Sequence, residues 1–298
     1  MSYAGVLLML EIALELILFS ALLHAGWNLF SKSSIDKLAF MWWMYFLGAI
    51  GYGLILLPMS TIYLATASVL PFLVSALAEV GYVLTLAKGY ERGDLSLVYP
   101  VSRGGAPVLT ALWAALLFGE RLPAFGIIGI LLSVAGVYFL SLSEANRSLR
   151  DVAKFQLSRA TTWALASAIF ISVYSVSDNF VVVSTPPAVY IWWVFMGNAV
   201  FLVPFVWRRA RMKGNVSEIK SNWRKISVAG AGSLVSYLAV LFALKLTSVS
   251  YVVTGRALSL LIAAILGVLF LKEKMGFMRI LGATLMILGM ATIAVLGS

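Results

Sequence analysis

The sequence predicts an all-α integral membrane protein in which ten transmembrane helices form a five-plus-five inverted repeat around a central cavity. Three observations support this fold class. Hydrophobic residues make up 62% of the 298 residues and charged residues only 11%, which is more apolar surface than a soluble domain of this length can bury. Apolar stretches of membrane-spanning length recur along the whole chain. One pattern that contains an arginine also occurs twice with the same spacing.

Apolar stretches between charges, prolines and polar clusters mark the ten spans. We expect the first five near 10–31, 38–58, 68–88, 95–118 and 122–142, and the second five near 160–182, 187–207, 225–246, 248–271 and 276–296. Each has the length that a bilayer-crossing helix needs. The expected units are a first repeat at 1–143, a polar connector at 144–159 and a second repeat at 160–298. Because five is odd, a duplicated half enters the membrane from the opposite side, which predicts an inverted repeat.

The charged residues indicate how the chain lies in the membrane. A net charge of +10 in a soluble protein would suggest nucleic acid as a partner. Here the basic residues cluster between apolar spans, so we expect contact with anionic lipid head groups and no nucleic acid. Most of them follow odd-numbered spans, which predicts those loops in the cytoplasm and both termini outside. Glu11 and Glu15 stand where a signal peptide carries basic residues, so we expect the first span to be retained.

The residue types also exclude several kinds of site. The chain has no cysteine and a single histidine, so it has no disulfide, no thiolate metal site and no cysteine nucleophile. Its apolar spans contain no acidic pair at metal-ligand spacing, no glycine-rich phosphate loop and no GxSxG motif. We therefore expect no enzymatic activity, no metal and no cofactor.

The repeated pattern places an arginine seventeen positions before an acidic residue, as Arg103 with Glu120 and as Arg256 with Glu273. An arginine at the middle of a bilayer costs about 2.5–3.5 kcal/mol on insertion scales, so it is expected to face water, a counter-ion or a solute. Its planar fork fits a carboxylate or a phosphate. The alternative is an internal ion pair that serves only helix packing, from Arg103 to Glu79 or from Arg256 to Asp178.

Two segments resemble a known family. The stretch YPVSRGGAPVLTALWAALLFGERL (99–122) resembles the fourth helix of bacterial EamA-type members of the drug/metabolite transporter superfamily, and HAGWN (24–28) is similar to the first helix of one branch. The resemblance covers the whole chain. It implies a secondary transporter in a bacterial or archaeal inner membrane, with a cavity lined mainly by helices 1, 3, 4, 6, 8 and 9. The two halves differ at Pro100 and Pro107, which predict a break in the fourth helix only.

Polar side chains in the cavity-lining spans are the candidate binding residues. Glu79 shares a helix face with Tyr82, and its carboxyl can exchange a proton or bind an ammonium group. His24 and Asn28 share a face of the first helix, with Trp27 beside them. His24 and Asp178 are further candidates for proton coupling, although Asp178 can equally be a solvated helix end. Cavity tyrosines can form a box for an ammonium or aromatic solute; they are Tyr82, Tyr99, Tyr174, Tyr237 and Tyr251.

These residues support the hypothesis of a transporter for a small anionic or zwitterionic solute, such as an amino acid, a carboxylate or a phosphonate. Transport proceeds by alternating access, with protons as an optional coupling ion. The expected partners are the solute and membrane lipids, and the expected state is a monomer or weak dimer because one chain supplies both halves. Two alternatives stay open: an exporter of organic cations or drugs, and a flippase for lipid-linked head groups.

Overall fold

The computed structural model describes residues 3–59, 63–118, 124–144, 158–213, 217–246, 252, 258–273 and 276–296. Helices account for nearly all of these residues, and none of them forms a strand. The helices are α1 (Tyr3–Ser33), α2 (Lys37–Met59), η1 (Thr66–Ser68), α3 (Val69–Arg92), α4 (Leu95–Phe118), α5 (Ala124–Glu144), α6 (Arg159–Ser184), α7 (Pro187–Phe201), α8 (Val203–Lys213), α9 (Ser217–Leu246), α11 (Leu258–Leu271) and α12 (Phe277–Leu296).

Six helical segments in the described part of the chain are long and apolar enough to cross a bilayer. They are Glu11–Ser33, Lys37–Pro58, Thr66–Arg92, Arg159–Ser184, Pro187–Arg209 and Glu218–Leu246, and two shorter apolar helices lie at Ala124–Gly136 and Phe277–Gly289. Their outward surface is apolar, with exposed leucine, isoleucine and phenylalanine side chains on most helices. Such a surface is stable only in lipid. The chain is therefore an all-α integral membrane protein.

The helix bounds differ from the expected spans in three places. α1 begins earlier, at Tyr3, and α9 begins earlier, at Ser217. α9 is kinked at Asn222, where the backbone torsions are φ −123° and ψ 16°. The span expected near 187–207 is divided at Leu202 into α7 and α8. The extension of α9, SEIKSNWRK, is rich in polar and charged residues, which an apolar length criterion cannot recognise as part of a helix.

The break expected in α4 is wrong, because Pro100 and Pro107 both lie inside one continuous helix. A proline removes one backbone hydrogen bond, but a membrane helix tolerates this loss where neighbouring helices hold it. The Tyr99 hydroxyl donates to Ser259 Oγ over 2.8 Å. The hydroxyls of Ser102 and Ser167 lie 2.7 Å apart. These side-chain bonds tie α4 to α11 and α6 beside the prolines.

Glycines bring α5 and α12 into close contact. A Cβ atom added to Gly136 would lie 2.6 Å from the carbonyl oxygen of Gly282, and one added to Gly289 would lie 2.5 Å from that of Gly129. The later glycine of each helix thus meets the earlier glycine of the other, so the two helices run in opposite directions. Gly129 and Gly282 are related by the same sequence offset as Arg103 and Arg256, and so are Gly136 and Gly289. Small residues of this kind let membrane helices pack backbone to backbone.

Other helices of the two halves also pack on each other, in pairs that the two halves repeat. We call residues before 144 the first half and residues after 157 the second half. α3 packs on α6 and α1 packs on α9, while α4 packs on α6 and α1 packs on α11. We match α1 to α5, in order, with α6, α7, α9, α11 and α12. Under this matching the α3–α6 contact corresponds to the α1–α9 contact, and the α4–α6 contact corresponds to the α1–α11 contact. α2 also packs on α7, α4 on α11 and α5 on α12, which join corresponding helices directly.

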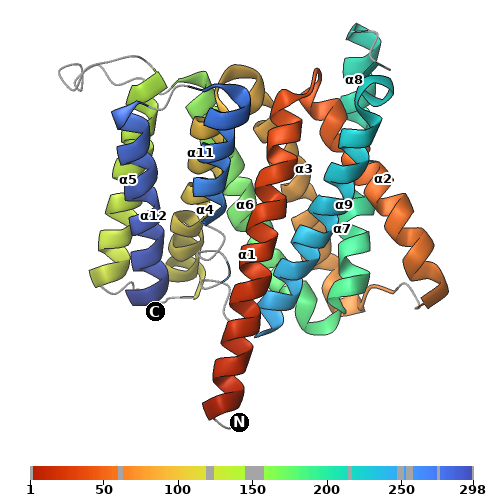
Figure 1. Ribbon diagram of the computed structural model, residues 1–298. Coiled ribbons are helices and arrows are strands. Elements are labelled where there is room, and N and C mark those ends of the chain that lie inside the picture. Colours follow the sequence, from red (N-terminus) through yellow and green to blue (C-terminus); the bar gives the residue numbers. More distant parts are fainter. Residues whose placement is uncertain are drawn as a thin grey trace.

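The helices form one bundle with α5 and α12 at one edge and α2 and α8 at the opposite edge (Figure 1). α1 begins and α12 ends at the lower end in this view, whereas α8 lies at the upper end. α1, α3, α6 and α9 lie between the two edges. The largest set of buried apolar side chains draws on both halves, from Ala25 of α1 to Met286 of α12. The interior of this bundle positions the polar residues described below.

We expect the substitution Gly136→Ala to lower the thermal stability of the protein in detergent. Its new methyl group meets the α12 backbone, where nothing can move aside easily, at a cost of roughly 1–3 kcal/mol. Gly289→Ala, at the equivalent position, is expected to have a similar effect. Gly51→Ala is the matched control, because a Cβ at Gly51 of α2 has no atom within 4 Å. Equal melting temperatures for all three variants would contradict the close crossing of α5 and α12.

Candidate functional site

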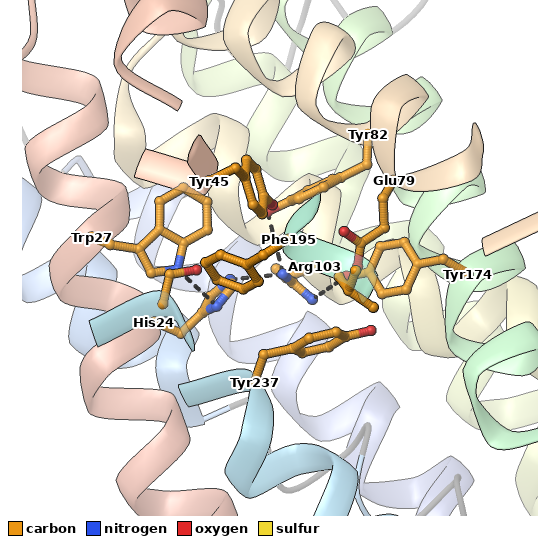
Figure 2. A pocket seen from close by; sticks show the side chains of 11 residues that line it. His24, Trp27, Tyr45, Glu79, Tyr82, Arg103, Tyr174, Phe195 and Tyr237 are labelled. Carbon is orange, nitrogen blue, oxygen red and sulfur yellow. Dashed lines mark hydrogen bonds between the residues drawn. The ribbon is translucent and has the colours of Figure 1, made fainter. Parts of the chain in front are cut away.

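A small cavity lies in the interior of the bundle, and both halves line it. The first half contributes His24, Trp27, Tyr45, Glu79, Tyr82 and Arg103, and the second half contributes Tyr174, Val194, Phe195, Ser233 and Tyr237. Figure 2 shows the Arg103 guanidinium near the centre of this group, with aromatic rings around it. Among the described residues, the cavity thus combines one permanent cation, one carboxyl group and several hydroxyl-bearing rings.

Arg103 makes its hydrogen bonds to uncharged groups. Its Nη1 donates to the Tyr174 hydroxyl over 3.0 Å, and its Nη2 donates to His24 Nε2 over 2.7 Å and to the Tyr82 hydroxyl over 3.3 Å (Figure 2). The guanidinium carbon also lies 5.3 Å from the centre of the Tyr82 ring. Within the described residues no carboxylate forms an ion pair with Arg103, and its buried Nε has no hydrogen-bond partner there. The ion pair with Glu79 considered from the sequence is not formed.

His24 receives two donors. Trp27 Nε1 donates to His24 Nδ1 over 3.1 Å, while Arg103 approaches Nε2. A neutral imidazole has only one nitrogen that accepts, and neither indole nor guanidinium can accept in return. One of the two contacts is therefore not a satisfied hydrogen bond. This side of the cavity has more N–H donors than acceptors.

Glu79 forms a separate acidic position on α3. Its side chain is 4% exposed, and its Oε2 accepts from Asn198 Nδ2 of α7 over 2.5 Å. The same amide nitrogen donates to the backbone carbonyl of Val194 over 3.0 Å. Asn198 Oδ1 is buried and has no hydrogen-bond partner among the described residues. One N–H of the Asn198 amide therefore holds the Glu79 carboxyl against α7, and the other bonds the amide to its own helix.

Asp178 is a second buried carboxyl group, on α6. It is 1% exposed, so the interpretation of Asp178 as a solvated helix end is wrong. Its Oδ1 accepts from Ser75 Oγ and from the Tyr190 hydroxyl, each over 2.5 Å. Its Oδ2 accepts from the hydroxyl of Tyr237, a residue that lines the cavity. Asp178 therefore lies directly behind the wall of the cavity, and Tyr237 connects the two.

The structure gathers most of the residues proposed from the sequence at this cavity. His24, Trp27, Glu79, Tyr82, Arg103, Tyr174 and Tyr237 line it. Asn28 and Tyr99 lie in the next layer, where Asn28 Oδ1 accepts from the Tyr90 hydroxyl over 2.6 Å and Tyr99 bonds to Ser259. Arg256 and Tyr251 lie outside the described residues.

Sequence reasoning missed Tyr45, Phe195, Ser233 and Asn198. Three of these, Tyr45, Phe195 and Asn198, belong to α2 and α7. These two helices were not among the expected cavity helices, although each supplies lining residues. Asn198 carried a usable signal, because an amide in an otherwise apolar span needs a buried partner. Tyr45 and Phe195 carried none, since aromatic residues are common throughout membrane helices. Among the described residues, no group of three or more His, Asp or Glu side chains is placed to bind a metal.

Comparisons with known proteins identify the family and the fold of the chain. The sequence model of the EamA-like transporter family matches the chain twice, over residues 12–142 and 158–295. No curated protein matches the chain. One similar solved structure, titled only as the crystal structure of a protein, is 17% identical in sequence. It has a TM-score of 0.63 and covers 99% of this chain and 98% of its own, which shows a shared fold.

Two buried arginines are expected to differ in what they do for stability. Arg279 donates to Ser96 Oγ over 2.9 Å and forms an ion pair with Asp94 at 2.5 Å, so Arg279→Gln is expected to lower the free energy of unfolding by about 1–2 kcal/mol. Arg103→Gln removes a charge that has no carboxylate partner in the described residues, so stability is expected to stay equal or to rise. Thermal unfolding in detergent measures both. A loss at Arg103 as large as that at Arg279 would indicate a structural role for Arg103.

Proposed function

Because the chain belongs to the EamA-like transporter family, we propose that it is a secondary transporter of a small anionic or zwitterionic organic solute. The solute binds in the cavity around Arg103, and the two halves move against each other to expose the cavity to one side of the membrane at a time. The single observation that carries this proposal is the Arg103 guanidinium, which faces the cavity and is held only by neutral groups in the described structure.

The proposed architecture is a ten-span, five-plus-five inverted repeat with units at 1–143 and 160–298, joined by a connector at 144–159. The two matches of one family model support a duplication. The opposite directions of α5 and α12 and the exchanged helix pairs support an inversion between the copies. In such a repeat the pseudo-twofold axis lies in the membrane plane and the solute site lies where the halves meet. Lining residues from both halves fit that position.

Arg103 is the proposed anion-binding residue. Arginine stays charged in any protein environment, and burial without a counter-ion costs several kcal/mol. A carboxylate or phosphonate that enters the cavity supplies the missing charge and can accept two parallel N–H bonds, including one from the unpartnered Nε. It also takes Nη2 away from His24, which relieves the excess of donors on that ring. These gains favour an anionic group over a neutral one.

The acidic side of the cavity supports a solute with an amino group as well. Glu79 lines the cavity opposite the His24 side of Arg103, as Figure 2 shows. Asp178 lies outside the cavity lining and accepts a hydrogen bond from the hydroxyl of Tyr237, which lines the cavity. An ammonium group near Glu79 would be balanced by this carboxyl and by the faces of Tyr82, Tyr174 and Tyr237. Amino acids and aminophosphonates carry both groups at a short separation, so they are the proposed solute class.

Glu79 is also the first candidate for proton coupling, with His24 and Asp178 as further candidates. A carboxyl group in a cavity that opens alternately to two sides can take up a proton on one side and release it on the other. Arg256 and Tyr251 stay predicted site residues from the second half. The proposed location is the inner membrane, with both termini outside.

An exporter of organic cations is the second candidate function. It is favoured by the ring of aromatic side chains, in which Tyr82, Tyr174 and Tyr237 have neighbouring ring centres 5.8 and 6.3 Å apart. Two carboxyl groups nearby add to the attraction for a cation. Thermal stabilisation by quaternary amines, and by no carboxylate or phosphonate, would favour this function over the first.

Transport into proteoliposomes tests the proposed function. Purified protein is screened for uptake of labelled amino acids, carboxylates and phosphonates, with and without a pH gradient. We expect Arg103→Gln to reduce uptake of the accepted solute by about tenfold or more, because a charge-assisted bond is lost. Arg224→Gln, which replaces an exposed arginine of α9, is the control and is expected to transport normally.

Two outcomes of this screen count against parts of the proposal. Full uptake of every anionic solute by Arg103→Gln would refute the role of the arginine. If the pH gradient drives uptake in the wild type, Glu79→Gln should abolish that dependence, and a retained dependence would exclude Glu79 as the coupling group.

A further inference from the structure

The ion pairs of the described residues share two properties. Arg209 Nε lies 2.8 Å from Asp36 Oδ2, Arg209 Nη2 also pairs with Glu91, and Arg279 Nη2 lies 2.5 Å from Asp94 Oδ2. In every case the arginine belongs to the second half and the acid to the first half. The acids lie beside the α1–α2 and α3–α4 connections and Arg279 lies near the start of α12, while Arg209 belongs to α8, which Figure 1 shows at the upper end of the bundle. The described residues form no ion pair at the opposite end.

Arg209 is the centre of the larger group, which we call the Arg209 cluster: Asp36, Glu91, Arg209 and Glu218. Asp36 is the N-cap residue of α2, since its Oδ1 accepts from the backbone N–H groups of Leu38 and Ala39. Its own backbone N–H donates to Glu218 Oε2 over 2.8 Å. Asp36 and Glu218 are buried, whereas the side chains of Arg209 and Glu91 are 22% and 30% exposed. The cluster therefore joins the ends of α2, α3, α8 and α9.

Three of the helices that enter the cluster, α2, α3 and α9, also line the cavity, and the fourth, α8, follows α7, which lines it as well. α2 runs from Asp36 to Tyr45 and α3 runs from Tyr82 to Glu91, while α7 and α8 lead from Phe195 to Arg209 and α9 leads from Glu218 to Ser233. At 1.5 Å per residue these segments place the cluster about 14 to 22 Å from the cavity along the helix axes, always toward the same end. The cluster thus lies on the route between the cavity and that side of the membrane.

Apolar packing fills the space between the cluster and the cavity. Met41, Met44, Leu202 and Ile226 are completely buried. A Cβ atom added to Gly230 of α9 would lie 2.9 Å from the Met44 carbonyl oxygen of α2. First-half and second-half helices are therefore in direct contact here, and the cavity is closed toward this end.

We propose that the Arg209 cluster is an ionic latch that closes one mouth of the transport pathway, and that it opens whenever the cavity faces that side. This inference rests on the alternating-access mechanism proposed above. Opening requires the first-half ends of α2 and α3 to separate from the second-half ends of α8 and α9. Among the described residues, this boundary is crossed by the bonds of Arg209 to Asp36 and Glu91 and by the bond from the Asp36 backbone N–H to the Glu218 carboxylate. By the charge distribution, the side it closes is the cytoplasm.

The composition of the latch suits repeated opening. Arg209 and Glu91 already reach solvent, so water can replace their mutual bond at small cost. When α2 separates from α8 and α9, Asp36 loses its bonds to Arg209 and Glu218, but its Oδ1 keeps the hydrogen bonds from the Leu38 and Ala39 backbone N–H groups of α2. A partly exposed pair of this kind biases the equilibrium between closed and open states without locking it.

Cysteine labelling tests the latch without any solute. The chain contains no cysteine, so Ser233→Cys places a single thiol in the wall of the cavity. Its rate of reaction with a membrane-impermeant maleimide is measured from each face of the membrane in vesicles of known orientation. We expect Arg209→Gln to raise the rate about fivefold from the face that carries the α8–α9 connection, the scale of one exposed ion pair. From the opposite face the rate is expected to fall.

Three further variants keep the test specific. Arg208→Gln replaces the exposed neighbouring arginine and is expected to leave both rates unchanged. Asp36→Asn is expected to raise the labelling rate in the wild-type background. It is expected to cause no further rise in the Arg209→Gln background, because both substitutions remove the same bond between Asp36 and Arg209. Glu91→Gln replaces Arg209→Gln in the test if that protein does not fold.

The outcomes separate the latch from the proposed function. Unchanged labelling, or an equal rise from both faces, would overturn the latch even if solute uptake proceeds as proposed. A one-sided rise in labelling supports the latch. If no organic solute is then transported by the wild type, the proposed function fails while the latch stands.

Discussion

A permanently charged guanidinium in the interior of a membrane protein constrains the rest of this structure. Arg103 reaches the middle of the bundle on α4, and within the described residues only tyrosine hydroxyls and one histidine hold it. An internal carboxylate at hydrogen-bond distance would have neutralised this charge and left the cavity without affinity for an anion. Instead, the two nearby acids are bound elsewhere, Glu79 by Asn198 and Asp178 by three hydroxyl groups. The separation keeps opposite charges apart within one cavity, which is the arrangement that a zwitterionic solute requires.

The packing of the bundle explains how the cavity can be both stable and mobile. Close glycine crossings, such as those between α5 and α12, join the halves through backbone contacts that depend on small residues. Elsewhere the halves also meet through side chains, with hydroxyl bonds between Ser20 and Ser236 and between Ser68 and Ser184. At one end they meet through arginine and carboxylate pairs. The glycine-mediated backbone contacts suit an interface that does not move during transport. The hydroxyl bonds and the ion pairs can break and be replaced by bonds to water or solute.

The sequence predicted those features that depend on composition and spacing. The membrane class follows from 62% hydrophobic residues, and the family match over 12–142 and 158–295 confirms the membership that the residues around Arg103 and His24 suggested. Periodicity could not predict that α4 stays continuous, because the bonds of Tyr99 and Ser102 to α11 and α6 are tertiary. It could not reveal that Asp178 is buried, since the donors Ser75, Tyr190 and Tyr237 come from three other helices. The partners of Arg209 are likewise distant in sequence, and charges near helix ends are usually solvated.

A structure of the protein with its transported solute bound tests the central claim most directly. The account predicts that the acidic group of the solute lies about 2.7–2.9 Å from the Arg103 guanidinium nitrogens, with the contact between Arg103 and His24 broken. If the acidic group instead binds away from Arg103, and the guanidinium keeps its bonds to His24, Tyr82 and Tyr174, the arginine is a structural residue and the account is contradicted.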